Sequence, residues 1–361
     1  MWDREIIKFV EKIQSMIENN FPLDRETSLQ LFKVPLPLLG KLARFMRFKL
    51  HPERIVTYVV DRNINYTNIC ISGCKFCAYF RAPNSPEAYV LSFEEIAKKI
   101  EETIALGGYQ ILLQGGLHPG LTLEYYEELF RFIKSKFPQI HLHALSPPEI
   151  IFLSKISKLT VDEVLKRLID AGLDSIPGGG AEILVDRVRE IISPNKATSE
   201  EWLYVMERAH LLGLKTTATM MFGHIETEEE ILEHLFKIRA LQDKTGGFTA
   251  FIPWTFQPKN TALSYIPKAG SAKYLQVLAI SRLVLHNIPN IQVSWVTQGP
   301  KIAQLALDFG GNDFGSTMIE ENVVAKAGAS YRLSEEEIRR YIQEAGYIPK
   351  RRKMDYTLLE N

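Results

Sequence analysis

The sequence has few cysteines, no long apolar run and no excess of charge of either sign. Its 43 Lys and Arg residues balance 43 Asp and Glu residues, so the formal net charge is zero. A chain without a basic excess lacks the attraction that binding to a phosphate backbone requires, which argues against a nucleic-acid partner. No segment approaches the roughly 18 consecutive apolar residues of a membrane-spanning helix, since the most apolar stretch, 275–285, contains Arg282. We therefore expect no membrane partner either.

Three cysteines, an odd number in 361 residues, argue against a disulfide framework. The first five residues, MWDRE, are acidic and amphipathic and do not resemble a secretory signal. These features predict a protein of the reducing cytoplasm. Because 46% of the residues are apolar and no tract is of low complexity, the chain can bury a large globular core.

From residue 55 onward, short apolar or β-branched segments alternate with segments of helical periodicity. The predicted strands are 55–60, 110–113, 140–145, 173–176, 215–221, 248–252 and 291–296, with a weak one near 311–315. The predicted helices are 92–106, 122–136, 160–171, 199–212, 227–242, 271–286 and 299–309. This alternation predicts an α/β fold with a parallel sheet, and its length fits a TIM-type (β/α) barrel of eight units. An open doubly wound sheet would show the same pattern.

The sequence of residues 1–50 predicts two or three helices and contains no pattern that indicates a catalytic or binding role. We expect them to form an N-terminal helical extension that packs on the outside or the bottom of the main domain. The barrel domain is then expected over residues 51–361, with a helical tail at its C-terminal end.

Glycine and polar residues are concentrated after the predicted strands, whereas no such clusters precede the strands. Five such clusters begin at residues 114, 146, 178, 223 and 254, with the sequences QGGLHP, SPPE, GGGAE, GHIE and WTFQP. In a barrel, the loops that follow the strands form the catalytic face. Glycines often simply end strands. Five clusters after successive strands nevertheless favour an active site at this edge.

All three cysteines lie in one short segment, CISGCKFC, directly after the first predicted strand. The C-x3-C-x2-C spacing brings Cys70, Cys74 and Cys77 onto one loop, in which Gly73 allows a tight turn. A four-iron cluster held by three thiolates keeps one iron open for a ligand, and the sequence has no fourth cysteine. Zinc is the alternative, although no second Cys or His pair follows at the spacing of a structural zinc site. Inert buried thiols are a weaker explanation.

This spacing, with the aromatic Phe76 before the third cysteine, resembles the motif of the radical S-adenosylmethionine (SAM) superfamily. The resemblance implies a 4Fe–4S cluster on Cys70, Cys74 and Cys77, with SAM chelated to the open iron. It also implies an external one-electron reductant such as flavodoxin or ferredoxin.

Several further stretches resemble the menaquinone-pathway and deazaflavin-pathway branch of that superfamily, and within it the cyclic dehypoxanthine futalosine synthase family. They are 61–68, 114–119, 141–144, 177–182, 216–224, 246–251 and 252–258. The resemblance implies a small-molecule substrate, dehypoxanthine futalosine, in which a benzoate is joined through a keto chain to a ribosyl group. Abstraction of the ribosyl C4′ hydrogen is followed by ring closure. Aminofutalosine synthase, the deazaflavin synthase subunit and a non-catalytic metal-binding or electron-transfer protein remain alternatives.

The resemblance also implies cofactor contacts. Phe76 is expected near the adenine, and Gln114, Gly115 and Gly116 occupy the place where relatives hold the methionine amino group. Leu117 stands where an acidic residue is usual, so Gln114 is the expected partner of that group. The remaining expected contacts of the cofactor are Ser146, Glu182 and Arg187, with Arg189 as an alternative to Arg187.

Catalytic and substrate-binding candidates follow the strands. His118, His143 and His224 are the candidate catalytic residues, although a single histidine is more often structural. Ser146 is also a candidate for contact with the substrate. The aromatic wall is expected from Phe251, Trp254 and Phe256, and the benzoate partner from Arg62, Arg81 or Arg282.

Overall fold

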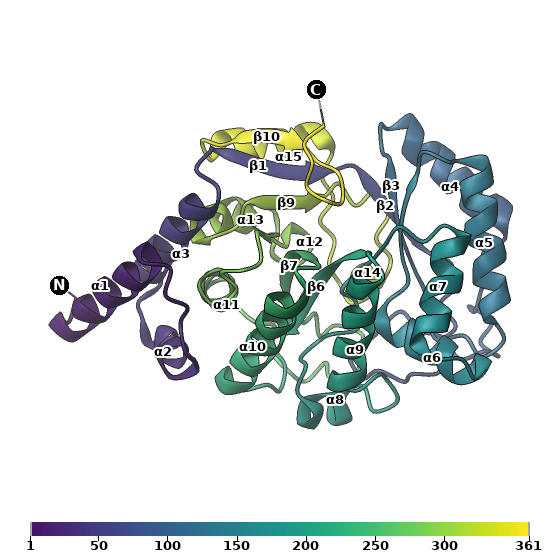
Figure 1. Ribbon diagram of the computed structural model, residues 1–361, viewed down its shortest axis with the longest axis horizontal. Coiled ribbons are helices and arrows are strands. Elements are labelled where there is room, and N and C mark those ends of the chain that lie inside the picture. Colours follow the sequence, from purple (N-terminus) through teal and green to yellow (C-terminus); the bar gives the residue numbers. More distant parts are fainter. Residues whose placement is uncertain (1, 360–361) are drawn as a thin grey trace.

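The computed structural model describes residues 2–359 and places a curled parallel sheet at the centre of the molecule (Figure 1). Seven strands form this sheet in the order β2-β3-β4-β5-β6-β7-β8. They are β2 (Asp61–Asn65), β3 (Gln110–Gln114), β4 (His141–Ala144), β5 (Ser175–Ile176), β6 (Lys215–Phe222), β7 (Phe248–Thr255) and β8 (Asn290–Ile291). A second sheet has the order β10-β1-β9 and contains β1 (Ile55–Val59), β9 (Asp313–Ser316) and β10 (Ile348–Arg351).

The two sheets are connected at one seam. Strand β1 continues into β2 after Val60, and β9 pairs with β1 in parallel. A parallel bridge between Gln292 and Asp313 joins the end of β8 to β9. The strands therefore follow one another around a ring, which confirms the predicted TIM-type barrel. The predicted strand 55–60 is β1 in the structure, and neither β2, which follows it directly, nor β10 was expected from the sequence.

Helices cover the outer face of the sheet (Figure 1). Helices α4, α7, α9 and α10 each begin with a capping box, in which a Ser or Thr side chain and a Glu three residues later bond each other's backbone N–H groups. Gly172 and Gly246, with φ angles of 120° and 61°, end α7 and α10. The helices between the strands are α4 (Phe93–Ala105), α5 (Leu123–Lys136), α6 (Pro147–Ser157), α7 (Val161–Ala171), α8 (Asp186–Ile192), α9 (Ser199–Leu211), α10 (Glu228–Thr245), α11 (Ser271–Val284), α12 (Trp295–Gln298) and α13 (Pro300–Ala306).

Three helices precede the barrel: α1 (Arg4–Glu18), α2 (Arg25–Gln30) and α3 (Leu36–Leu50). Helix α3 packs on α11, α1 packs on α3, and α2 packs on α10. After β9 the chain forms α14 (Val323–Lys326), α15 (Glu335–Glu344) and β10. Within residues 2–359, no helix is both long enough and apolar enough to cross a membrane.

Candidate active site

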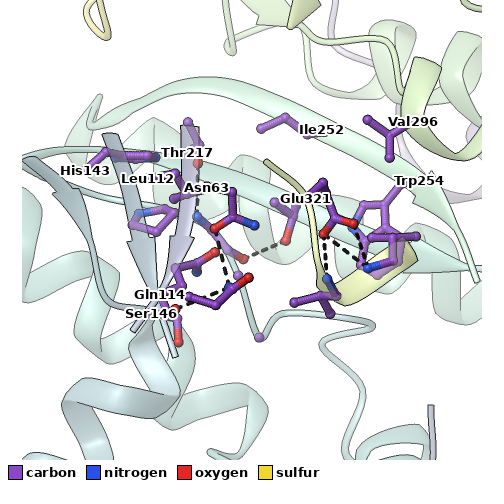
Figure 2. Close-up of a pocket in the computed structure, with 18 of the residues that line it drawn as sticks. Asn63, Leu112, Gln114, His143, Ser146, Thr217, Ile252, Trp254, Val296 and Glu321 are labelled. Atoms are coloured by element: carbon purple, nitrogen blue, oxygen red, sulfur yellow. Dashed lines mark hydrogen bonds between the residues drawn. The ribbon is translucent and has the colours of Figure 1, made fainter. Parts of the chain in front are cut away.

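A cavity of about 410 Å³ begins at the carboxyl ends of the strands and extends into the barrel. Its lining comes from the cysteine loop, from inward-facing positions of β2, β3, β6 and β7, and from the C-terminal residues Arg352, Met354 and Tyr356. In Figure 2, Gln114 and Ser146 lie on one side of the cavity, and Trp254 and Glu321 lie on the other. The polar clusters that follow the strands therefore converge on one space, except for the cluster at 223–226, which does not line it.

The cysteine loop is fixed by backbone hydrogen bonds to distant segments. The Cys70 N–H donates to the Arg81 carbonyl at 3.1 Å, and the Lys75 N–H donates to the Ile192 carbonyl at 2.8 Å. Gly73 adopts a φ of 61°, a left-handed conformation that favours glycine. All three cysteines line the cavity.

The thiols of Cys70 and Cys74 lie within hydrogen-bond distance of polar groups on neighbouring residues. The Leu117 N–H donates to Cys70 Sγ at 3.2 Å, and Ser72 Oγ lies 2.9 Å from Cys70 Sγ and 3.3 Å from Cys74 Sγ. Burial raises the pKa of the Cys74 thiol to about 11, and burial also raises the pKa of Cys77. Among the described residues, no three Cys, His, Asp or Glu side chains converge closely enough to hold one metal ion.

Two glycines let the loop after β3 pass close to the cysteine loop. A Cβ on Gly116 would lie 2.1 Å from the Ile69 carbonyl oxygen and 2.6 Å from Cys70 Cβ. A Cβ on Gly115 would lie 2.4 Å from the Tyr66 ring. No side chain fits at either position without displacing its neighbours, so the paired glycines are required by packing.

A buried carboxylate faces the cavity from the loop after β5. Glu182 is 5% exposed, and its Oε1 accepts a hydrogen bond from Lys196 Nζ at 2.9 Å. Its Oε2 has no hydrogen-bond partner among the described residues and lies 3.8 Å from Arg189. Arg189 itself donates to the carbonyl groups of residues 180, 181 and 197. Since a buried polar atom is normally hydrogen-bonded, Oε2 is available to a donor on a bound ligand.

A second buried carboxylate, Glu149, had no role assigned from the sequence. Its oxygens accept hydrogen bonds from Ser146 Oγ at 2.5 Å, from the Tyr66 hydroxyl at 2.6 Å and from the Gly115 N–H at 3.1 Å. Burial raises the pKa of Glu149, and the donors around it act in the opposite direction. The Glu149 carboxylate thus connects the Ser146 side chain to the backbone of the paired glycines through hydrogen bonds. Only its place in the cluster SPPE pointed to it.

The three histidine candidates have different surroundings. His143 is 6% exposed and lines the cavity, and its Nδ1 lies 2.7 Å from Ser175 Oγ, which also lies 2.7 Å from His141 Nε2. Burial lowers the pKa of His143 well below its ordinary value. His118 lies outside the cavity, where its Nδ1 accepts a backbone N–H at 2.9 Å. His224 also lies outside it, held within its own turn after β6.

The arginine candidates do not line the cavity, and each is bound elsewhere. The pairs are Arg187 with Glu230, Arg62 with Glu102, Arg81 with Glu87, and Arg282 with the carbonyls of Gly310 and Pro289. Two other cations do line the cavity, Lys196 and Arg352, and both are paired, with Glu182 and Asp313 respectively. Neither was identified from the sequence.

Aromatic side chains form part of the wall. Trp254 and Phe76 line the cavity, whereas Phe251 and Phe256 are fully buried in the layer behind it. Further aromatic residues that line it were not expected: Tyr79, Phe80, Trp295 and Tyr356.

Comparison with known proteins identifies the family. Residues 64–238 match the radical SAM superfamily, and residues 245–361 match the CofH/MqnC C-terminal region. The chain is 46% identical over 351 residues to cyclic dehypoxanthine futalosine synthase of Halalkalibacterium halodurans, covering 97% of this chain and 95% of that protein. The chain is a radical SAM enzyme of the CofH/MqnC family. It is also 44% identical to the 5-amino-6-(D-ribitylamino)uracil–L-tyrosine 4-hydroxyphenyl transferase of Methanothermobacter thermautotrophicus, covering 94% of this chain and 95% of that protein.

Solved structures support the fold. The FeFe-hydrogenase maturase HydG from Carboxydothermus hydrogenoformans has a TM-score of 0.77 at 18% identity, covering 98% of this chain and 82% of that chain. Methylornithine synthase (PylB) has a TM-score of 0.73 at 17% identity, covering 93% of this chain and 97% of that chain. At these identities the likeness concerns the fold alone.

Membership of the superfamily implies a 4Fe–4S cluster and SAM. The residues present fit both groups, because three thiols share one loop at the cavity and an unpartnered carboxylate oxygen, Glu182 Oε2, faces it. When bound together, the two cofactors supply a 5′-deoxyadenosyl radical that abstracts hydrogen from a substrate. The protein's part is to position the reacting atoms and exclude water, as a cavity within a barrel does.

Proposed function

We propose that this enzyme converts dehypoxanthine futalosine to cyclic dehypoxanthine futalosine in the biosynthesis of menaquinone. The proposal rests on one observation, the 46% identity to cyclic dehypoxanthine futalosine synthase across 97% of the chain. In the reaction the ribosyl C4′ hydrogen atom would pass to the 5′-deoxyadenosyl radical, which leaves as 5′-deoxyadenosine. C4′ would then bond to the aromatic ring, and the resulting ring radical would lose one electron to an acceptor and one proton to a base.

The cavity provides a place for each group in this proposal. Cys70, Cys74 and Cys77 would hold the cluster, because they are the cysteines of the chain and all line the cavity. The cofactor would lie along the remaining cavity-lining residues that the family pattern indicates, Phe76, Gln114, Gly115, Gly116, Ser146 and Glu182. Arg187 has no part in this arrangement, since its guanidinium is bound to Glu230 outside the cavity.

The interior of the barrel suits a substrate with many hydroxyl groups. Amide and hydroxyl side chains line it, namely Asn63, Asn65, Gln110, Gln114, Thr217, Thr219, Gln292, Ser294 and Thr297. Such groups donate and accept hydrogen bonds without carrying charge, as recognition of a ribosyl group requires. His143 is the histidine candidate in contact with this space.

A label at the reacting carbon tests the proposal. The reconstituted, reduced enzyme is incubated with SAM and dehypoxanthine futalosine deuterated at C4′. We expect one deuterium in the released 5′-deoxyadenosine and formation of the cyclic product. Unlabelled 5′-deoxyadenosine at full conversion would place the abstraction elsewhere. An adduct of the nucleoside with the substrate would indicate the aminofutalosine synthase reaction instead.

A second function has comparable support. The transferase of Methanothermobacter thermautotrophicus is 44% identical over 350 residues, so its named reaction is the alternative. Incubation of the same enzyme with 5-amino-6-(D-ribitylamino)uracil and L-tyrosine separates the two. Turnover of this pair, with no turnover of dehypoxanthine futalosine, would replace the first proposal.

A further inference from the structure

A partly buried positive charge lies beside the cysteine loop. Lys196 lines the cavity, and its side chain is 16% exposed. Its Nζ lies 5.3 Å from the centre of the ring of Phe76, a residue that lies between Cys74 and Cys77 in the sequence. The segment that carries Lys196 is held against the cysteine loop by the hydrogen bond from the Lys75 N–H to the Ile192 carbonyl. The ammonium group is therefore held at a fixed position next to the thiols.

The charges around Lys196 do not cancel. Among the described residues in contact with Glu182, two cations, Lys196 and Arg189, face this one carboxylate. Arg189 is 3% exposed, so neither it nor Glu182 is strongly screened by solvent. Glu182 is shared by these two cations, so it does not neutralise both of them.

A cluster bound by three thiolates becomes more negative when it accepts an electron. A positive charge held nearby in a poorly screened position favours the more negative, reduced form. We propose that Lys196 raises the reduction potential of the cluster, with Glu182 opposing it, so that the pair sets how easily the enzyme is reduced. The inference rests on the assignment of the cluster to the three cysteines. It does not depend on which substrate the enzyme takes.

The test is a redox titration of the full-length reconstituted protein without SAM or substrate, in which EPR measures the reduced cluster. In Lys196→Met, we expect the ratio of reduced to oxidised cluster at a fixed potential to fall at least tenfold, which is about 59 mV for one electron. Lys196→Arg keeps the charge and should stay near the native value. Glu182→Gln removes the opposing charge and should raise the ratio.

Lys75→Met is the matched control. Lys75 lies on the cysteine loop itself but is exposed, so solvent screens its charge and its removal should change the ratio little. Equal ratios in Lys196→Met and Lys75→Met would overturn the inference. If Lys196→Met holds no cluster, Glu182→Gln decides, and an unchanged or lowered ratio there would overturn the inference too. If the native protein assembles no 4Fe–4S cluster, iron and sulfide analysis shows that first, and it is the proposed function that fails.

Discussion

Replacement of Gly116 by alanine tests whether the close approach of two loops forms the cluster site. Gly116 follows β3, and its Cα hydrogen faces the backbone just before the first cysteine. The added methyl group would lie 2.1 Å from the Ile69 carbonyl oxygen and 2.6 Å from Cys70 Cβ. Because both contacts are with the backbone or with Cβ, no flexible side chain can move aside. The loop that carries Cys70 must shift instead.

The cost follows from overpacking. An extra methyl group in a well-packed site typically lowers the free energy of unfolding by about 1–3 kcal/mol. At about 2.1 cal/mol/K of unfolding entropy per residue, each kcal/mol lowers the melting temperature of this chain by about 1.3 °C. We expect Gly116→Ala to melt only about 1–4 °C below the native protein. The loss of cluster iron should be much larger, because the displaced loop carries the ligand Cys70, whose Sγ accepts the Leu117 N–H of the loop after β3.

The assay compares circular dichroism melting with iron and sulfide per chain after anaerobic reconstitution. Gly270→Ala is the control, since a Cβ at Gly270 meets nothing within 4 Å and its φ of −75° suits alanine. Gly270 precedes α11 as its N-cap, so that variant should lose at most about 1 kcal/mol and no iron. If Gly116→Ala keeps native iron content and stability, the close approach of the loops is unimportant and the reasoning is refuted.

Three further predictions concern the buried Arg282, the pH dependence of stability through His234, and the cluster ligand Cys74. Arg282→Met should lower the free energy of unfolding, measured in urea titrations, by about 2–5 kcal/mol, because the buried carbonyls that Arg282 binds lose their hydrogen-bond donor. A variant with native stability and only a raised KM for the substrate would contradict this structural role. Burial lowers the pKa of His234 from 6.5 to about 3. The unfolded chain then binds the extra proton at this position, so His234 alone lowers the stability by about 2 kcal/mol at pH 5 relative to pH well above 6.5. This loss should be absent in His234→Gln. Cys74→Ala should fold yet cleave no SAM, and normal cleavage would exclude it as a ligand.

Much of the barrel could be predicted from sequence because its outer shell follows simple rules. Apolar residues at helical spacing and short β-branched segments identified the helices and strands. The glycine-rich ends of the strands indicated the catalytic edge, and four of the five clusters line the cavity. The three cysteines were identified by spacing alone. Each of these signals is local, so one chain segment contains all the information.

What could not be predicted depends on contacts between distant segments. Lys196 has no motif, and it reaches the cavity only because the loop between α8 and α9 packs on the cysteine loop. Arg352 and Tyr356 reach the cavity from the C-terminal end, where the unexpected strand β10 follows helix α15. Conversely, Arg62, Arg81 and Arg282 were expected to bind benzoate because of their charge, yet each is bound outside the cavity. Arg62, for example, pairs with Glu102, which is 40 residues away along the chain, and also lies 3.9 Å from Glu320.

Strand β2 shows most clearly why the interior of the barrel escaped prediction. Its sequence, DRNIN, is polar and was not assigned to a strand, yet every residue in it is buried. Asp61, Asn63 and Asn65 alternate into the cavity, while Ile64 belongs to the apolar core between the sheet and its helices. In a barrel whose interior is only a packed core, these inward positions are occupied by Val, Ile and Leu. Polar side chains there exchange burial of apolar surface for hydrogen-bonding groups, and their mutual hydrogen bonds offset the cost of burying them: Asp61 accepts from Gln110 and Ser316. The polar pattern that hides this strand from hydrophobic periodicity is thus the same one that lines the cavity with hydrogen-bonding groups.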